Sequence, residues 1–481
     1  MKIRNRLLRA GFGLAALGLA LTGTACNGLE SGGGSDAPSA PLAPLKPRLD
    51  SDMADLVAAI VVPTQMASFK TTAMGSGGHP LFRGGQPRGA VRQHGELLGI
   101  LQDHGVRLLE VQQLLESALE NARKKGKLAD WLRQTFPHTA DQAIERLDEL
   151  TAESLFAQRD DHFYIRHPDG SLDPLFSGFP SMFWARDFAI STPRGIIVGN
   201  GLRYSRSREN SLIRLLFQYS DELQNFPIAF DAAEEGVFLD GGDTLVLDEQ
   251  TLLVGVGNRT SPEAAPLLAK RLGMDVIAVQ MPPRAESGGL RRQLLHLDTI
   301  FNLVDEKTVL AVPFFLEERY SESNPIKPLL EGLARQSKAL KELLPDYEWG
   351  NLEAVEVTLK AMHQVGWVTR YQAETGEAQE LKTKLVDFMR SQGYRVIFVG
   401  GDQGDLPAEK YALERAFYEL RWQGANVIQL APGKVVAFEH NHWTNQALRQ
   451  AGIEVLTFDG ELLSMSNGGP HCLVMPLMRG R

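Results

Sequence analysis

The stretch Phe238-Leu239-Asp240-Gly241-Gly242-Asp243-Thr244 joins two short apolar runs, residues 237–239 and 244–247. Two neighbouring glycines between two acids let the backbone turn sharply and present a carboxylate at the end of a strand. The same residues also make an ordinary surface turn, which is the more common outcome for such a sequence. The stretch therefore predicts a strand–turn–strand unit, with Asp240 and Asp243 as candidate functional carboxylates.

Apolar runs of strand length recur on both sides of this turn and alternate with helical patterns, which indicates an α/β protein. The predicted strands are residues 56–62, 106–111, 182–190, 195–199, 237–239, 244–247, 251–256, 294–304, 308–312, 395–399, 427–430 and 435–438. The predicted helices between them are residues 91–104, 207–217, 262–272, 408–421 and 445–451. Two longer stretches, residues 112–155 and 326–392, are predicted to be helical insertions. No fixed period is visible, so the pattern fits both a doubly wound sheet and a radial repeat.

A second cluster, His296-Leu297-Asp298-Thr299, lies inside the apolar run 294–304. Side chains alternate along a strand, so a strand here would place His296 and Asp298 on the same face. An imidazole and a carboxylate on one face could serve as a base and a cation clamp. A surface salt link at a strand edge is an alternative of equal weight.

The chain has two cysteines, Cys26 and Cys472, in such different surroundings that a structural disulfide is not expected. Cys472 lies in a glycine-flanked loop before the apolar run 473–477. A thiol, an imidazole and carboxylates are what nucleophilic catalysis requires, because the thiolate is the attacking species. The same residue types would suit a cysteine hydrolase of amides, but the papain-type order and local signature are absent from the sequence.

Cys26 ends an N-terminal segment with the features of an export signal. A basic start is followed by the apolar residues 10–21, which are too few to span a membrane comfortably as a mature helix. Small residues precede the cysteine, and residues 1–26 resemble a bacterial lipoprotein signal in which Cys26 is lipidated. An ordinary secretory signal is the alternative. Residues 27–50, rich in Gly, Ser, Ala and Pro, predict a flexible tether to a catalytic domain at 51–481. We therefore expect a cell-envelope protein that is lipid-anchored to a membrane, or else periplasmic or extracellular.

The formal net charge of −9 argues against nucleic-acid binding, because phosphate binding needs clustered Lys and Arg. The charge is compatible with a cationic small substrate, although many acidic proteins are simply soluble. His440 and His442 lack partners at metal-ligand spacing, so we expect no metal. A homo-oligomer is compatible with the sequence.

Taken together and in order, five motifs resemble those of the arginine deiminase family, within the guanidine-modifying pentein superfamily. The motifs are Phe183-Trp184-Ala185-Arg186-Asp187, Leu239-Asp240-Gly241-Gly242-Asp243, Gly257-Asn258-Arg259-Thr260, His296-Leu297-Asp298-Thr299 and Gly468-Gly469-Pro470-His471-Cys472. The resemblance runs from about residue 56 to the C-terminus. It implies a five-bladed, pseudo-symmetric α/β-propeller with helical insertions and no metal or cofactor.

Carried over to this sequence, the resemblance implies that Cys472 is the nucleophile that attacks a guanidinium carbon. His296 would be the general acid and base. Asp240 takes the place of a catalytic carboxylate that is usually glutamate in arginine deiminases and aspartate in amidinotransferases. Asp187 and Asp298 would hold the guanidinium nitrogens, as the bidentate geometry of a carboxylate allows.

The resemblance also assigns the far end of the substrate. Arg206 and Arg259 fall where the family has arginines that hold the substrate carboxylate. A third arginine is expected shortly before the cysteine, where this chain has Asn467. Asn467 can still donate a hydrogen bond, so a modified or peptidyl arginine is an alternative to free L-arginine. Asp243 is counted with these substrate-binding residues.

The expected activity is hydrolysis of a guanidino compound, with release of ammonia through a thiouronium intermediate linked to the cysteine. One alternative is an amidinotransferase, which passes the amidino group to an amine instead of water. The other alternative, from a different class, is a lipid-anchored protein that binds arginine-like ligands without turnover.

Overall fold

The computed structural model describes residues 47–62, 87–137, 141, 144–157, 164–166, 172–174, 182–202, 204–257, 259–283, 294–321, 323–325, 327–343, 363–465 and 468–480. Cys26, with the predicted signal and most of the tether, lies outside these residues. Asn467 lies outside them too.

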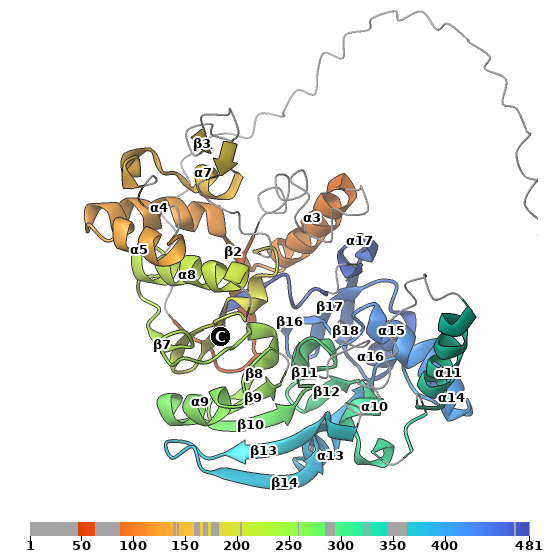
Figure 1. Ribbon diagram of the computed structural model, residues 1–481. Coiled ribbons are helices and arrows are strands. Elements are labelled where there is room, and N and C mark those ends of the chain that lie inside the picture. The colour runs from red at the N-terminus through yellow and green to blue at the C-terminus, as the bar shows by residue number, and fades with distance from the viewer. Residues whose placement is uncertain are drawn as a thin grey trace, which may run out of the picture. The chain divides into compact units, whose positions relative to one another are not determined.

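Strands and helices alternate along the described chain (Figure 1). The strands are β1 (Leu56–Val61), β2 (Arg107–Glu110), β3 (Tyr164–Arg166), β4 (Leu172–Pro174), β5 (Ala189–Thr192), β6 (Gly195–Val198), β7 (Ile228–Asp231), β8 (Thr244–Asp248), β9 (Thr251–Val256), β10 (Asp275–Gln280), β11 (Phe301–Asp305), β12 (Thr308–Ala311), β13 (Trp367–Tyr371), β14 (Ala378–Lys384), β15 (Arg395–Phe398), β16 (Ile428–Ala431), β17 (Lys434–Phe438), β18 (Glu454–Phe458) and β19 (Met475–Arg479). The helices are α3 (Pro87–Asp103), α4 (Val111–Lys124), α5 (Leu128–Thr135), α7 (Ala152–Ala157), α8 (Tyr204–Tyr219), α9 (Ala264–Leu272), α10 (Pro313–Leu316), α11 (Lys327–Leu343), α13 (Leu385–Ser391), α14 (Ala408–Tyr411), α15 (Phe417–Arg421), α16 (His442–Gln450) and α17 (Glu461–Ser464). The short 3-10 helices are η1 (Leu147–Glu149), η3 (Ala185–Asp187), η4 (Gly241–Asp243), η6 (Leu297–Thr299) and η7 (Glu318–Tyr320). A short π-helix is η8 (Ala412–Ala416). The predicted α/β class is confirmed.

Within the described ranges, five sheets share one pairing pattern, in which a first strand runs antiparallel to a second and the second parallel to a third. The triplets are β5-β6-β7, β8-β9-β10, β11-β12-β15, β16-β17-β18 and β19-β1-β2. A parallel pair needs a crossover, and helices α3, α8, α9 and α16 lie in four of these connections. The repeat is therefore a β-β-α-β unit.

The two predicted helical insertions have different outcomes. The first, at 112–155, does contain helices, namely most of α4, α5 and the start of α7. In α4, Leu114, Leu115, Ala118 and Leu119 are buried at helical spacing. The second, at 326–392, was expected to be helical throughout. It contains the helices α11 and α13, but the expectation is wrong for residues 367–371 and 378–384. Strands β13 and β14 form a hairpin there, and β13 pairs antiparallel with β10. The hairpin extends the sheet of a different unit, and such long-range pairing leaves no local pattern in the sequence.

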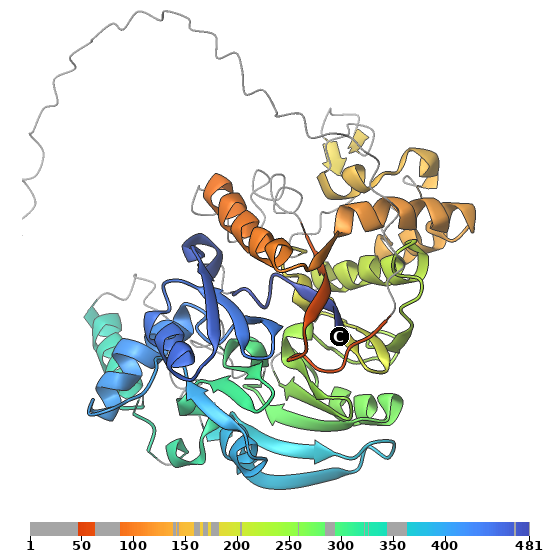
Figure 2. The ribbon, with the colours of Figure 1, turned by 180° about the vertical axis from the view of Figure 1, so that it is seen from behind.

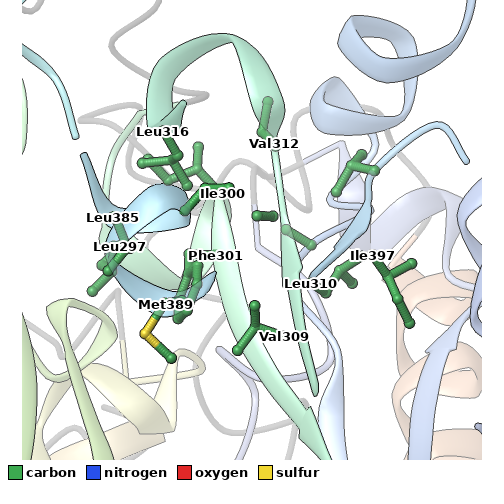
Figure 3. Close-up of a cluster of buried hydrophobic side chains, with 14 of the residues drawn as sticks. Leu297, Ile300, Phe301, Val309, Leu310, Val312, Leu316, Leu385, Met389 and Ile397 are labelled. Atoms are coloured by element: carbon green, nitrogen blue, oxygen red, sulfur yellow. The ribbon is translucent and has the colours of Figure 1, made fainter. Parts of the chain in front are cut away.

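The largest hydrophobic core lies around β11, β12 and α13 (Figure 3). Phe301, Leu310, Leu385 and Met389 are buried there together. Leu297, which directly follows His296, belongs to the same core and is fully buried. The core therefore anchors the turn that carries the predicted acid–base residue.

The first and last strands of the described chain lie side by side. β1 pairs antiparallel with β19, and Figure 2 shows β1 beside the C-terminal end. The buried Leu49 also forms a bridge with Arg479. The fold thus begins before residue 50, where the predicted tether was expected to end. No helix in the described part of the chain is long and apolar enough to cross a bilayer.

Candidate active site

The predicted catalytic residues and Asp187 share one position in the repeat, the segment by which the chain enters the first strand of a unit. Asp187 ends η3 before β5, and Asp240 precedes η4 and β8. His296 precedes η6 and β11, and Cys472 lies just before β19. The fourth unit supplies Asn426, just before β16. Equivalent backbone positions in five units thus bring together residues that are far apart in the sequence.

His296 is held between two carboxylates. Its Nε2 lies 3.1 Å from Oδ2 of Asp240, and its Nδ1 lies 3.6 Å from Oδ1 of Asp187. The expectation that His296 and Asp298 share one face of a strand is wrong, because residues 297–299 form the turn η6 and β11 begins only at Phe301. The two side chains accordingly have different neighbours.

The charge around His296 favours its protonated form. Burial alone would lower the pKa of His296, but Asp187, Asp240 and Asp243 outweigh burial and raise the pKa to about 9. For Asp240 burial has the opposite effect and would raise the pKa of the carboxyl group. The hydrogen bond and charge of His296, together with the charge of Arg259, nevertheless hold this pKa below its usual value. At neutral pH the pair is therefore an imidazolium beside a carboxylate.

The paired glycines of the opening motif make this close packing possible. A Cβ on Gly242 would lie 2.6 Å from Nδ1 of His296 and 3.1 Å from Oδ1 of Asp187. A Cβ on Gly241 would overlap the backbone carbonyl oxygen of Arg186. The two glycines therefore allow this turn to pack directly against the segments that carry His296 and Asp187, with no side chain between them.

Asp243 is buried and is held by hydrogen bonds to two neighbouring segments. Its Oδ2 accepts a hydrogen bond of 2.8 Å from the Thr260 hydroxyl, and its Oδ1 accepts one of 2.9 Å from the Leu297 amide. Burial raises the pKa of Asp243 to about 7 despite these bonds. Both carboxylate oxygens are thus engaged by protein donors, and the contact with Leu297 ties Asp243 to the loop of His296.

Cys472 is unpaired and buried, with 5% of its surface exposed. Its Sγ lies 3.6 Å from Oδ2 of Asp298. Its amide donates to Oδ1 of Asn426 at 3.2 Å, and the Asn426 side-chain amide donates to the backbone oxygen of Asp298 at 3.1 Å. Asn426 therefore joins the cysteine loop to the Asp298 loop.

The thiol is protonated in the substrate-free site. Burial raises the pKa of Cys472 well above its usual value, and the charges of Asp298 and Asp187 raise it further. Burial would also raise the pKa of Asp298, but the hydrogen bond from His471, with the charges of His296 and Arg186, holds it low. The thiol therefore lies near two carboxylates, and a cation bound there would favour the thiolate.

In each of those carboxylates one oxygen lacks a hydrogen bond from the described residues, although Oδ1 of Asp187 lies within ion-pair distance of His296. Oδ1 of Asp187 and Oδ1 of Asp298 are buried and accept no hydrogen bond from any residue that the structure describes. Buried carboxylate oxygens are normally hydrogen-bonded. The two oxygens are therefore suited to a ligand with several N–H donors, such as a guanidinium group.

The two arginines predicted to bind the substrate carboxylate are paired with acidic residues of the predicted site. Arg206 donates to Oδ2 of Asp187 at 2.8 Å, and Nη1 of Arg259 lies 3.6 Å from Oδ2 of Asp240. The structure thus places both arginines at the site. Asn467, the third residue predicted for this end of the substrate, lies outside the described residues.

Arg186, Asp52 and Asn426 were not predicted as functional from the sequence. The Arg186 amide donates to the Cys472 carbonyl, and its guanidinium donates to the carbonyls of Gly241 and Thr244 and to Oδ2 of Asp52. Arg186 therefore ties three site loops together. Its place beside Asp187 in the first motif was the available signal, whereas Asp52 and Asn426 carried none beyond a polar residue next to a strand.

Within the described ranges, no group of three or more His, Cys, Asp or Glu side chains is arranged to hold a metal ion. The chemistry that these ranges offer is that of a buried thiol, an imidazolium and anionic carboxylates. Such a set is suited to an enzyme that carries out nucleophilic attack on a small cation.

Comparison with known proteins agrees with this class. The family model described as arginine deiminase matches residues 86–479. An arginine deiminase of Listeria innocua is 24% identical over 406 residues, covering 81% of this chain and 87% of that protein. An arginine deiminase of Mycoplasma capricolum subsp. capricolum is 26% identical over 412 residues, covering 81% of this chain and 86% of that protein.

Solved structures show a weaker likeness. Unliganded AgrE gives a TM-score of 0.47 at 14% identity, over 89% of this chain and 40% of that chain. The product-bound N-terminal domain of ArgZ, a cyanobacterial arginine dihydrolase, gives 0.46 at 11% identity, over 89% and 99%. SxtG, an amidinotransferase from Microseira wollei, gives 0.44 at 12% identity, over 90% and 97%. These TM-scores lie below 0.5, so the assignment rests on the sequence match.

The sequence matches identify an enzyme, a hydrolase acting on the carbon–nitrogen bonds of a linear amidine. The match over most of the chain makes the family clear: the protein belongs to the arginine deiminase family.

Proposed function

We propose that the protein hydrolyses the guanidino group of L-arginine, or of a modified or peptidyl arginine, to a ureido group and ammonia. One observation carries this proposal. The buried Cys472 lies near two buried carboxylates, Asp187 and Asp298, and each of these has one oxygen without a hydrogen-bond partner among the described residues. A planar cation with N–H donors on two edges would satisfy both oxygens and present its carbon to the thiol.

The proposed reaction begins when the bound guanidinium lowers the pKa of Cys472 and the thiol proton passes to solvent. The thiolate sulfur then forms a bond to the guanidinium carbon. The carbon–nitrogen bond to one terminal nitrogen breaks, and ammonia leaves with a proton from His296. A thiouronium linked to Cys472 remains. Water attacks its carbon as the neutral His296 takes one proton. The carbon–sulfur bond then breaks, the remaining hydroxyl proton passes to the departing sulfur, and the ureido product leaves.

The raised pKa of His296 supports this order of events. An imidazole that is protonated up to about pH 9 is ready to donate to the leaving nitrogen before it must accept a proton from water. Asp240, which contacts Nε2, would stabilise the imidazolium and hold its orientation. Asp243 would act through the Leu297 amide rather than on the substrate.

The pairing of the arginines bears on the rest of the substrate. If Arg206 and Arg259 bind a substrate carboxylate, their contacts with Asp187 and Asp240 must break, or be shared with the substrate, when the guanidinium binds. This exchange would suit free L-arginine. A substrate without a free carboxylate would leave both pairs in place, which keeps modified and peptidyl arginines in the proposal.

The test is a panel of L-arginine, arginine derivatives, arginyl peptides and agmatine, assayed for ammonia and for a ureido product, with Cys472→Ser as the control. Turnover that is lost in Cys472→Ser supports the proposal, and turnover that survives the substitution refutes the mechanism. Adding an amine such as glycine tests for an amidinotransferase, which would yield a new guanidino compound. Tight arginine binding by the wild-type protein without loss of arginine over hours would instead favour a binding protein.

We also propose that Cys26 is lipidated and holds the protein in the cell envelope. The basic and apolar residues before Cys26 and the small residues next to it support this location. Labelled fatty acid should enter the wild-type protein but not Cys26→Ala, and the variant should leave the membrane fraction. Equal membrane association of the two proteins would refute the anchor.

For the fold we propose a five-bladed propeller whose blades are the repeated β-β-α-β units. The pairing of β19 with β1 supports this arrangement, because it completes one blade from the two ends of the described chain. A crystal structure with these units in one ring would test it, and an open row of sheets would rule it out.

A further inference from the structure

His471, immediately before the nucleophile, contacts one of the two carboxylates that would hold the substrate. Its imidazole is fully buried, and Nδ1 lies 2.8 Å from Oδ2 of Asp298. The same Oδ2 lies 3.6 Å from Sγ of Cys472. The other oxygen of Asp298, Oδ1, has no hydrogen-bond partner in the described part of the chain. The two oxygens of Asp298 therefore have separate tasks.

The surroundings of His471 fix its protonation state. Asp298 faces Nδ1, and the buried Arg186 and Asp52 act on the imidazole from the other loops. Burial and Arg186 lower the pKa of His471, and they outweigh the two carboxylates. The imidazole is thus neutral near pH 7. Because Asp298 is ionised, the proton of the neutral ring is assigned to Nδ1, from which it donates to Oδ2.

We propose that His471 is a positioning residue that orients the carboxylate of Asp298, so that Oδ1 faces the guanidinium of the substrate and Oδ2 stays beside the Cys472 thiol. This inference rests on the proposed function and deepens it. It gives the protein a second histidine with a task separate from that of His296, which contacts Asp187 and Asp240 instead.

Physical chemistry favours a neutral donor in this place. The terminal torsion of an aspartate has broad minima, so a lone carboxylate does not hold one oxygen in one direction. A hydrogen bond from Nδ1 fixes that torsion. A neutral imidazole does so without a full positive charge, which would compete with the guanidinium for Asp298.

The backbone couples this bond to the nucleophile. The His471 amide donates to the Asn426 carbonyl at 3.4 Å, and the Cys472 amide donates to Oδ1 of Asn426 at 3.2 Å. The imidazole and the thiol therefore lie on one anchored segment. The position of Asp298 is set by the same loop that carries the attacking atom.

Two isosteric substitutions separate this role from simple packing. The amide nitrogen of Asn can occupy the place of Nδ1, whereas the amide of Gln reaches the place of Nε2. We expect His471→Asn to keep kcat/KM within about threefold of wild type, and His471→Gln to lose about 10- to 100-fold, mainly through KM, since a hydrogen bond to a charged group is lost. Equal loss in both variants, or no loss in His471→Gln, would overturn the proposal.

A second readout needs no turnover. Alkylation of Cys472 by iodoacetamide, located by peptide mass spectrometry to separate it from Cys26, should be about tenfold slower in His471→Gln than in wild type or His471→Asn. Without the Nδ1 donor, the full charge of Asp298 acts on the thiol and raises its pKa further. Equal alkylation rates in all three proteins would refute the positioning role.

The two hypotheses fail in different ways. If the wild-type protein turns over no guanidine in the panel, the proposed function fails, while the alkylation rates still test the position of Asp298. ¹⁵N NMR of the wild-type histidines provides a check that does not depend on a variant folding. His471 should carry its proton on Nδ1, and an Nε2–H tautomer would overturn the inference.

Discussion

Nε2 of His296 lies 3.1 Å from Oδ2 of Asp240, and both side chains are buried. The carboxylate therefore acts at close range on the imidazole that the proposed reaction needs as an acid. In water such a contact would have little effect, but in a buried site the two charges stabilise each other more strongly. Asp240 should therefore control the proton affinity of His296.

Replacing Asp240 by Asn should lower the pKa of His296. The substitution removes a negative charge and the charged hydrogen-bond acceptor, while Asp187 and Asp243 remain. We expect the pKa to fall from about 9 by at least about one pH unit, with a large loss of turnover. NMR titration of the histidine ring measures this directly. Asp103→Asn, at an exposed position of α3, is the control, and an unchanged His296 titration in Asp240→Asn would contradict the prediction.

The same histidine should make the stability of the fold depend on pH. Because the pKa of His296 is raised from 6.5 to about 9, its stabilising effect is fully present below pH 6.5 and is lost as pH rises through about 9. The difference between the two pKa values corresponds to roughly 3 kcal/mol. Urea unfolding of wild type and His296→Gln should show the difference between them shrinking from pH 6 to pH 9.5. A constant difference would mean that the pKa is not raised.

A methyl group at Gly242 should disable the site without unfolding the protein. Its Cβ would lie 2.6 Å from Nδ1 of His296, so the imidazole must move away from Asp187. We expect Gly242→Ala to lose at least about 100-fold in kcat, because small displacements of catalytic groups have effects of that size. Gly99→Ala, within α3 and with no atom near its Cβ, is the matched control and should be fully active. Equal activity of the two variants would count against the close approach.

Local sequence explains which parts of the fold could be predicted. The runs that became β8, β9, β12 and β17 are apolar and largely buried, and such runs are recognisable without knowledge of their partners. β14 is largely exposed and has the sequence Ala-Gln-Glu-Leu-Lys-Thr-Lys, which resembles a charged helix. Pairing with β13 makes it a strand, and that pairing depends on tertiary structure.

In the candidate active site, too, some residues could be predicted from the local sequence and others could not. Cys472 was predicted because it is flanked by glycines, and His296 and Asp298 because they lie inside an apolar run, and both patterns are visible in a sequence. Asp52 could not be found, because it meets Arg186 from 134 positions away and stands in an unremarkable polar stretch. The prediction that His296 and Asp298 share one face of a strand was wrong because residues 297–299 form a short turn. The alternation of side chains along a strand cannot reveal that a turn takes the place of the strand.

Asp243 should tolerate Asn but not Ala. Burial raises the pKa of Asp243 from 3.8 to about 7, so its contribution to stability is present below pH 3.8 and is lost as pH rises through about 7. Asp243→Asn resembles the protonated form and should gain stability relative to wild type above pH 7 while keeping most of kcat. Asp243→Ala leaves the Leu297 amide without its acceptor and should lower both stability and kcat. If Asn and Ala instead raise KM equally, Asp243 binds substrate directly.

Asp52 should be needed for stability although it lies outside the part of the chain that the family model matches. Its Oδ2 lies 3.2 Å from Nη2 of Arg186, and its Oδ1 lies 3.8 Å from Nε of Arg479, with all three side chains buried. Asp52→Asn would leave two buried guanidinium groups without their counter-charge. We expect the free energy of unfolding to fall by about 3–5 kcal/mol, as when one partner of a buried pair is removed. Glu96→Gln, which breaks the exposed pair with Arg92, is the matched control and should leave the urea midpoint nearly unchanged. If Asp52→Asn shifts the midpoint no more than Glu96→Gln does, the buried charges do not depend on Asp52.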